Sequence, residues 1–151
     1  MNIKKVLKES CIAMDLHSNT KTGIIEELVD VLVVAGKITD KQAAVAAVIE
    51  RERKGSTGLQ HGVAIPHGKT NTVEGLVAAL GIKKNGVDFA SHDGEPCRIF
   101  VLTVSPANRT GPHMEYLAEI GRLLEQASVR ERILAAHTQT EVIGIITEDS
   151  K

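Results

Sequence analysis

Residues 55–68 read Gly-Ser-Thr-Gly-Leu-Gln-His-Gly-Val-Ala-Ile-Pro-His-Gly, a glycine-rich loop that leads into a short apolar segment. The apolar residues 63–65 predict a brief buried strand. Pro66 should end its pairing, because proline has a fixed φ and no backbone N–H, and Gly68 lets the chain leave in almost any direction. His67 is therefore expected at the end of a strand, where α/β sheets collect ligands and reacting groups.

Two amphipathic helices are predicted before this loop. Apolar residues recur at helical spacing over 24–35, and Asn19 or Thr20 can cap the start. A second helix begins with a capping box at 39–42 and ends just before the loop. Its last turn brings Arg51 close to the loop at residues 55–68.

Two buried strands are predicted after the loop. The runs 76–82 and 99–104 are apolar almost throughout, short, and bounded by turn residues. Their unbroken apolarity indicates that both faces of each strand are covered. Turn signals at 85–86 and at 93–96 separate the two strands.

The C-terminal third is predicted to be helical. Pro112 stands where the first position of a helix tolerates proline, and capping boxes at 128–131 and 138–141 introduce two more apolar segments. Helices before and after the strands predict an α/β fold: a single layered domain over residues 1–151, with a small mixed, mostly parallel sheet flanked by helices.

Composition argues against several classes of function. The 151 residues are 42% hydrophobic and only 2% aromatic, with a formal net charge of -1. Few aromatic side chains and no basic excess argue against nucleic-acid binding. The apolar runs are shorter than the roughly 20 residues that span a bilayer. The N-terminus lacks the pattern of a signal peptide, and Cys11 and Cys97 lack metal-ligand spacing. A cytoplasmic protein without direct membrane insertion is therefore expected.

Three kinds of site find little support. The six histidines form no H-E-x-x-H motif, and His61 and His67 flank a proline-stopped strand, so a zinc site would lack a third ligand. No serine lies in a G-x-S-x-G elbow. The loop at 55–58 lacks the G-x-x-x-x-G-K-[ST] sequence of a nucleotide-binding loop. No metal or cofactor is expected, and a metal-dependent enzyme stays as a third hypothesis.

His67 is better suited to act as a nucleophile toward phosphorus. An imidazole is neutral and has a free lone pair near physiological pH, and its N–P bond keeps enough transfer potential to pass the group on. Phosphoryl transfer otherwise needs alignment and donors for the equatorial oxygens. The candidate donors are Arg51, Ser56, Thr57 and the backbone N–H of Gly68.

His113 is a second candidate histidine. It stands at the predicted start of a helix, where its own N–H, the helix dipole and unpaired amides favour a nearby anion. It also shares a helical stripe with Leu117, so a half-buried structural histidine is the competing interpretation. The functional hypothesis places both histidines against one phosphoryl group.

These motifs resemble the active-site signature of a known family. The residues concerned are Arg51-Glu52, Ser56-Thr57-Gly58, Gly62-Val-Ala-Ile-Pro-His67-Gly68, Asp93-Gly94-Glu-Pro96 and His113-Met-Glu-Tyr-Leu117. In this order, through nearly the whole chain, they are similar to enzyme IIA of the fructose/mannitol class (type 2) of the bacterial phosphoenolpyruvate:sugar phosphotransferase system. The resemblance includes the nitrogen-regulatory branch of that class.

The resemblance implies a function and partners. His67 would accept a phosphoryl group from phosphohistidine on an HPr-type carrier protein and hand it to a cysteine of an enzyme IIB in sugar uptake, supported by Arg51 and His113. The nitrogen-regulatory branch implies the alternative: a phosphorylation-switched binding module that acts on regulatory protein targets without a sugar permease. One departure is visible, since Gln60-His61 stands where many relatives have Gly-Asn. No IIB-type or membrane segment is recognised, so a separate acceptor molecule is expected.

Overall fold

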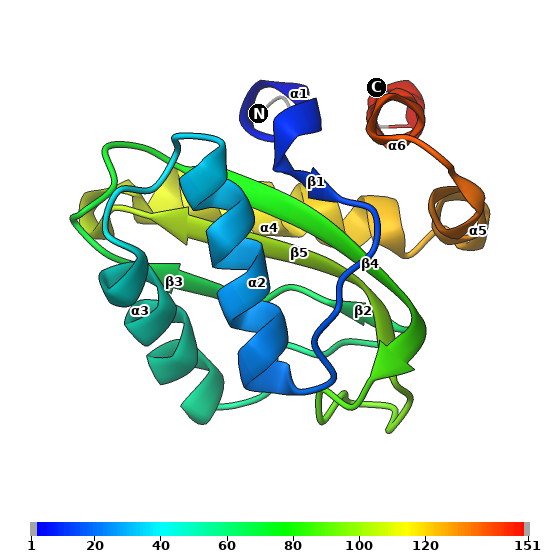
Figure 1. Ribbon diagram of the computed structural model, residues 1–151, viewed down its shortest axis with the longest axis horizontal. Coiled ribbons are helices and arrows are strands. Elements are labelled where there is room, and N and C mark those ends of the chain that lie inside the picture. Colours follow the sequence, from blue (N-terminus) through cyan, green and yellow to red (C-terminus); the bar gives the residue numbers. More distant parts are fainter. Residues whose placement is uncertain (1–2, 150–151) are drawn as a thin grey trace.

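The computed structural model describes residues 3–149, which form a five-stranded sheet with helices on both faces (Figure 1). The strand order is β1-β4-β5-β2, and β3 also pairs with β5. The two long strands β4 and β5 run antiparallel, whereas the three short strands pair in parallel with one or the other. This confirms the predicted α/β fold with a mixed sheet in which most pairings are parallel. The strands are β1 Ile12–Ala13, β2 Val63–Ala64, β3 His67–Lys69, β4 Val77–Val87 and β5 Cys97–Ser105.

Helices form layers on the two faces of this sheet. In Figure 1, α2 and α3 lie in front of the strands and α4 lies behind them, while α1, α5 and α6 gather at the β1 edge. The strand β5 is thus buried along almost its whole length. The helices are α1 Ile3–Val6, α2 Lys21–Val34, α3 Lys41–Arg53, α4 Thr110–Leu124, α5 Ala127–Ala135 and α6 Gln139–Asp149, with 3-10 turns at Glu9–Cys11 and Ala107–Arg109.

The starts of α2 and α3 follow local capping chemistry. Thr20 Oγ1 accepts a hydrogen bond from Gly23 N at 3.1 Å, which confirms Thr20 as the cap of α2. The cap of α3 is Asp40, whose Oδ1 accepts from Ala43 N at 3.0 Å, so the predicted capping box that begins at Thr39 is wrong by one residue. Aspartate and threonine are both strong caps, so the sequence alone does not rank two neighbours.

The C-terminal helices confirm one predicted cap and contradict another. At the start of α6, Thr138 Oγ1 accepts from Glu141 N at 3.1 Å, as predicted. Helix α5 begins earlier than predicted, at Ala127 after the cap residue Gln126, so the box at 128–131 lies inside the helix. The helix thus starts two residues earlier than the predicted box, and its cap residue makes no side-chain hydrogen bond to the first turn.

Strand β4 continues through a segment that was predicted to be a turn. Gly86 has φ +78° inside β4, and the pairing with β5 shifts register between Ile82 and Val87. A Cβ at Gly86 would approach Pro96 Cβ to 2.9 Å, so glycine is required where the bulged strand meets the next turn. The glycine signal at 85–86 therefore marks a bulge within a strand and not its end.

The chain around His67 also differs from the prediction. It does not leave the sheet after Pro66 but resumes pairing as β3, where His67 lies opposite Thr103 of β5. Pro66 lacks only the donor: its carbonyl oxygen accepts a hydrogen bond from Thr103 N at 3.1 Å. His67 therefore begins a strand and does not simply follow the end of one.

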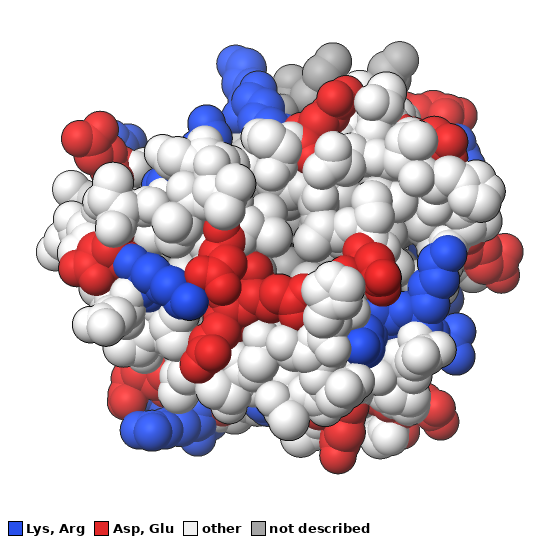
Figure 2. All heavy atoms as spheres, viewed as in Figure 1, with Lys and Arg blue, Asp and Glu red and all other residues white. Residues whose placement is uncertain are grey.

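The face that carries α2 and α3 has mixed charge. Figure 2 shows acidic and basic side chains side by side on it, without a continuous basic stripe. Lys41 Nζ and Asp30 Oδ1, for example, form an ion pair at 2.8 Å between the two helices. This face lacks the uniform positive charge that nucleic-acid backbones select. Within residues 3–149, none of the helices is long and apolar enough to span a membrane.

Candidate active site

The His67 ring is held in one orientation by its own loop. Its Nδ1 lies 2.8 Å from the carbonyl oxygen of Ile65. Because a carbonyl only accepts hydrogen bonds, Nδ1 carries the proton and Nε2 keeps the lone pair. Burial lowers the pKa of His67 below its ordinary 6.5; the hydrogen bond to Ile65 opposes this effect, and the charge of Arg51 adds to it. The ring is therefore neutral at pH 7, with Nε2 as its nucleophilic atom.

A close approach of helix α3 brings Arg51 to this ring. A Cβ at Gly68 would lie 2.7 Å from the carbonyl carbon of Ala47, so β3 can pass this close to α3 only with glycine. Arg51, one turn after Ala47, lines the same cavity as His67, and its Nη1 donates to Gly55 O at 2.9 Å. Gly68 also lines this cavity, but the contact with α3 is by itself sufficient reason for a glycine there.

His113 approaches from α4 on the other side of the cavity. The helix begins at Thr110, so His113 is its fourth residue and Pro112 its third, two positions later than predicted. The residue is 1% exposed, and its ring stands edge-on to that of His67, with centroids 5.6 Å apart. Its Nε2 lies 2.8 Å from Thr103 Oγ1. Among residues 3–149, nothing hydrogen-bonds its buried Nδ1.

The buried surroundings of His113 keep it uncharged. Burial lowers the pKa of His113 to about 4, with smaller contributions from His67 and Lys69. A charged imidazolium there would have to give up its hydration. Two neutral rings therefore face each other, and the ring predicted as either structural or functional is both buried and part of the cavity lining.

The two histidines share a cavity of about 400 Å³. Among the described residues, its charged lining consists of three cations and one anion: Arg51, Lys54, Lys69 and Glu50. The ammonium of Lys69 donates to Thr110 Oγ1 at 2.8 Å and so bridges β3 and α4. A dianionic group would meet more positive than negative charge in this cavity.

Lys54 and Lys69 were not among the predicted site residues. Residues two apart in a strand point to the same face, so a strand beginning at His67 would have identified Lys69 as its neighbour. Because pairing was predicted to stop at Pro66, His67 and Lys69 were not recognised as neighbours on one face of a strand. The two-residue spacing is visible in the sequence, but it has this meaning only if residues 67–69 form a strand.

The hydroxyls of Ser56 and Thr57 turn inward and do not line this cavity. Ser56 Oγ donates to Phe89 O at 2.7 Å, and Thr57 Oγ1 donates to Glu52 Oε1 at 2.5 Å. The Glu52 carboxylate also accepts from Thr57 N and pairs with Lys21 Nζ, each at 2.8 Å. Both hydroxyls thus brace the loop, and the structure brings neither to the two histidine rings.

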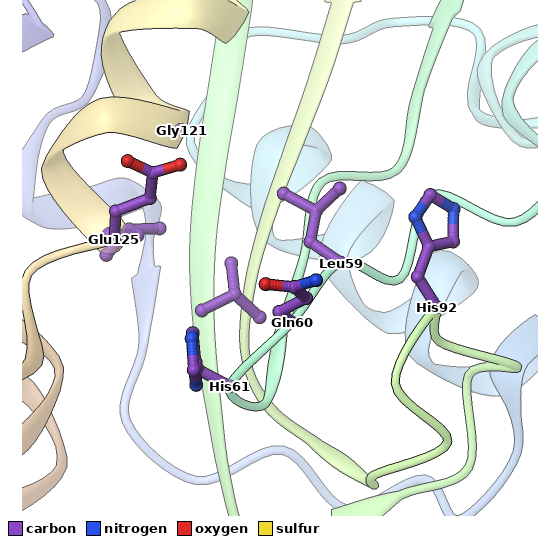
Figure 3. Close-up of a pocket in the computed structure, with 8 residues that line it drawn as sticks. Leu59, Gln60, His61, His92, Gly121 and Glu125 are labelled. Carbon is purple, nitrogen blue, oxygen red and sulfur yellow. The ribbon is translucent and has the colours of Figure 1, made fainter.

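Gln60 and His61 lie at a second hollow, shown in Figure 3. This hollow measures about 410 Å³, and Figure 3 shows Glu125 and His92 on opposite sides of it. It shares no lining residue with the cavity of His67. In the described part of the chain, no three His, Cys, Asp or Glu side chains gather as a potential metal site.

The sequence is similar to those of known proteins over almost its whole length. The family model for "Phosphoenolpyruvate-dependent sugar phosphotransferase system, EIIA 2" matches residues 5–149. The chain is 35% identical over 151 residues to the PTS system fructose-specific EIIABC component of Bacillus subtilis, with 100% of this chain and 24% of that protein covered. It is 32% identical over 147 residues to the PTS system fructose-specific EIIA component of Haloferax volcanii, with 97% of this chain and 96% of that protein covered. The chain thus spans about a quarter of the Bacillus protein and nearly all of the Haloferax one.

Similarity also extends to solved structures. The crystal structure of the Nitrogen Regulatory Protein IIA-Ntr from Neisseria meningitidis matches with a TM-score of 0.88 and 31% identity, covering 95% of this chain and 97% of that chain. The similarity therefore includes both fructose-specific and nitrogen-regulatory relatives. The match of the family model to almost the whole chain shows that this protein belongs to the EIIA 2 family of the phosphoenolpyruvate-dependent sugar phosphotransferase system.

Proposed function

We propose that this chain is a phosphocarrier that accepts a phosphoryl group on His67 from an HPr-type protein and passes it to a cysteine of an EIIB protein. One observation carries the proposal: the hydrogen bond from His67 Nδ1 to Ile65 O leaves the Nε2 lone pair available in a cavity with excess positive charge. An imidazole in this state can act as a nucleophile toward phosphorus at neutral pH.

The proposed reaction exchanges one bond to phosphorus for another in each of two steps. The Nε2 lone pair of His67 attacks the phosphorus of a phosphohistidine on the donor, and the electron pair of the breaking N–P bond returns to the donor ring. In the second step a cysteine thiolate of EIIB forms an S–P bond, and the lone pair of His67 Nε2 is restored. Both steps depend mainly on alignment and on stabilisation of the equatorial oxygens.

The cavity supplies that stabilisation in the proposal. Arg51 and Lys69 provide positive charge, and Gly68 is proposed to contribute by letting α3 approach β3, which places Arg51 in the cavity of His67. His113 provides a ring nitrogen for one phosphoryl oxygen. Ser56 and Thr57 are inferred to act through the loop that they brace, because their hydroxyls are already hydrogen-bonded away from the cavity.

The relatives support two versions of this function. The two fructose-specific relatives favour a role in sugar uptake, with EIIB as the phosphoryl acceptor. The similarity to IIA-Ntr favours the alternative, in which phosphorylation changes the affinity for a regulatory protein target. A phosphoryl group adds close to two negative charges, which is sufficient to change a docking surface.

Incubation with phosphoenolpyruvate, enzyme I and HPr tests the shared first step. Intact-mass spectrometry should find one acid-labile phosphoryl group on the wild-type protein and none on His67→Ala. His137→Ala is the matched control, because His137 is exposed and lies outside the cavity, and it should be phosphorylated like the wild type. An unmodified wild-type protein, or a phosphorylated His67→Ala variant, would contradict the proposal.

Onward transfer separates the two versions. The phosphorylated protein is mixed with EIIB proteins of fructose and mannitol systems, and a role in sugar uptake predicts that the group moves to a cysteine of one of them. Retention of the group against all of them, together with binding to a regulatory protein that depends on phosphorylation, supports the nitrogen-regulatory version.

A further inference from the structure

Thr103 is a buried hydroxyl beside the two histidines and was not among the predicted site residues. It is 0% exposed on β5 and lies opposite His67 in the parallel pairing with β3. Paired residues of neighbouring strands project to the same side of a sheet, so Thr103 and His67 share a face. On that face the Thr103 hydroxyl lies 2.8 Å from His113 Nε2.

The hydrogen bond between Thr103 and His113 has two alternative directions. If Nε2–H donates to the hydroxyl oxygen, the Thr103 O–H needs another acceptor and the Nδ1 lone pair needs a donor. Residues 3–149 supply no such partner to either atom. If Thr103 O–H donates to Nε2, the hydroxyl hydrogen has its acceptor and Nδ1 carries a hydrogen and no lone pair. Only this Nδ1–H is then unpaired. Buried polar groups are nearly always satisfied, so the second direction is favoured.

We propose that Thr103 is a positioning residue: its hydroxyl donates to His113 Nε2 and holds this ring as the Nδ1–H tautomer, which offers Nδ1–H to a phosphoryl group on His67. The inference rests on the proposed function, because a phosphoryl oxygen is the acceptor that the resting site lacks. An unpaired buried N–H is unfavourable until that oxygen arrives, so the arrangement favours the phosphorylated state over the resting one.

The tautomer matters because His113 does not ionise near neutral pH. Burial holds its pKa at about 4, so each ring nitrogen carries either a hydrogen or a lone pair. In the Nδ1–H form the ring attracts a phosphoryl oxygen, whereas in the Nε2–H form the Nδ1 lone pair repels it. The Thr103 hydroxyl thereby determines which of these two interactions His113 makes.

Nuclear magnetic resonance of isotope-labelled protein measures the tautomer from the chemical shifts of the two ring nitrogens. At neutral pH, wild-type His113 should be protonated on Nδ1. Thr103→Val removes the hydroxyl at nearly the same shape and should move the ring toward the Nε2–H form, and Thr103→Ser should restore the wild-type form. An Nε2–H ring in the wild type, or an unchanged tautomer in folded Thr103→Val, overturns the proposal. The wild-type measurement needs neither a variant nor a phosphoryl donor.

The rate of phosphoryl uptake from phosphorylated HPr is the second readout. Thr103→Val should slow uptake by roughly 10-fold to 100-fold, as expected for the loss of one hydrogen bond to a charged group. Thr103→Ser should recover most of the rate, and Thr72→Val, an exposed threonine outside the cavity, should match the wild type. A wild-type rate for Thr103→Val overturns the proposal. Absence of uptake by the wild type refutes the proposed function instead, and the tautomer measurement still decides what Thr103 does to His113.

Discussion

Two hollows of similar volume contain histidines, but their surroundings differ. The cavity at His67 measures about 400 Å³ and the hollow at His61 about 410 Å³. His67 is half-buried, hydrogen-bonded to a backbone carbonyl and faced by a second buried ring, whereas His61 and His92 are exposed. The charged neighbour in the second hollow is Glu125, a carboxylate (Figure 3).

This difference supports the proposal that His67, and not His61, takes part in phosphoryl transfer. The two hollows do not differ much in volume, and both are lined by two histidines. What separates them is a ring nitrogen whose protonation is decided by a hydrogen bond, together with the sign of the surrounding charge. The cavity of His67 has Arg51, Lys54 and Lys69 around it, whereas among the described residues no lysine or arginine lines the hollow of His61.

Arg51→Gln tests the contribution of charge and has the largest expected effect on phosphoryl uptake. Phosphoryl uptake should fall by about 100-fold, because one preorganised donor to the transferring group is lost. The measurement is the initial rate of uptake from phosphorylated HPr, with urea unfolding to confirm that the loss of the Arg51 bond to Gly55 O leaves the fold intact. Glu125→Gln is the matched change in the second hollow and should keep the wild-type rate. Equal rates for both variants would mean that charge does not distinguish the hollows.

His113 should make the fold sensitive to acid. Its pKa is about 4 in the folded protein and near 6.5 when unfolded, so on acidification the unfolded chain takes up the proton first. The free energy of unfolding should therefore decrease as pH falls from about 6.5 to about 4, by about 3 kcal/mol in total. Urea unfolding of the wild type and of His113→Gln across this range measures the difference. His113→Gln should lose this part of the pH dependence, and parallel curves would contradict the burial argument.

Thr57→Val tests the loop that connects the two hollows. The variant removes a hydroxyl that is bonded to the buried Glu52 carboxylate, so it should destabilise the protein by about 1–3 kcal/mol. Uptake per folded molecule should change little, because the hydroxyl does not reach the cavity. Unfolding in urea and uptake at low temperature are measured on the same preparation. A large loss of uptake without a loss of stability would instead support direct contact between Thr57 and phosphate.

His61→Gly has the smallest expected effect. His61 has φ +61°, a conformation that disfavours side chains, and its backbone N donates to Asp93 Oδ2 at 3.0 Å whichever residue is present. Glycine removes the strain but has more freedom in the unfolded chain, so the net stabilisation should be below about 1 kcal/mol. Thermal unfolding and phosphoryl uptake are the measurements, and uptake should be unchanged. Slower uptake would show that the second hollow takes part in transfer.

Patterns of apolar residues along the chain were enough to predict two helices and the two long strands. Helical periodicity identified α2 and α3, and unbroken apolar runs identified β4 and β5. These patterns depend on residues that are neighbours in the chain, which is why they can be read without coordinates. That His67 carries the phosphoryl group stays a prediction, based on the local motif Pro-His-Gly and on the resemblance to a family.

Apart from the starts of α3 and α5, predictions failed where the outcome depends on a distant partner. The chain resumes pairing after Pro66 because β5 offers a free edge there, and position 86 of β4 requires glycine because Pro96 lies against it. Neither neighbour is marked by spacing along the chain. The same holds for Lys69, which lines the cavity because β3 is a strand that places it on the same face as His67.

The sequence by itself determined most of the helices and the two long strands, the positions of the apolar residues, and that both His67 and His113 follow a proline. Only the tertiary structure decided how each polar side chain is used. A threonine hydroxyl has the same local signature whether it meets a carboxylate, as Thr57 does, or an imidazole, as Thr103 does. The protonation of His113 follows from packing between β5 and α4, which brings Thr103 to its ring, whereas the protonation of His67 follows from a contact with Ile65 inside its own loop.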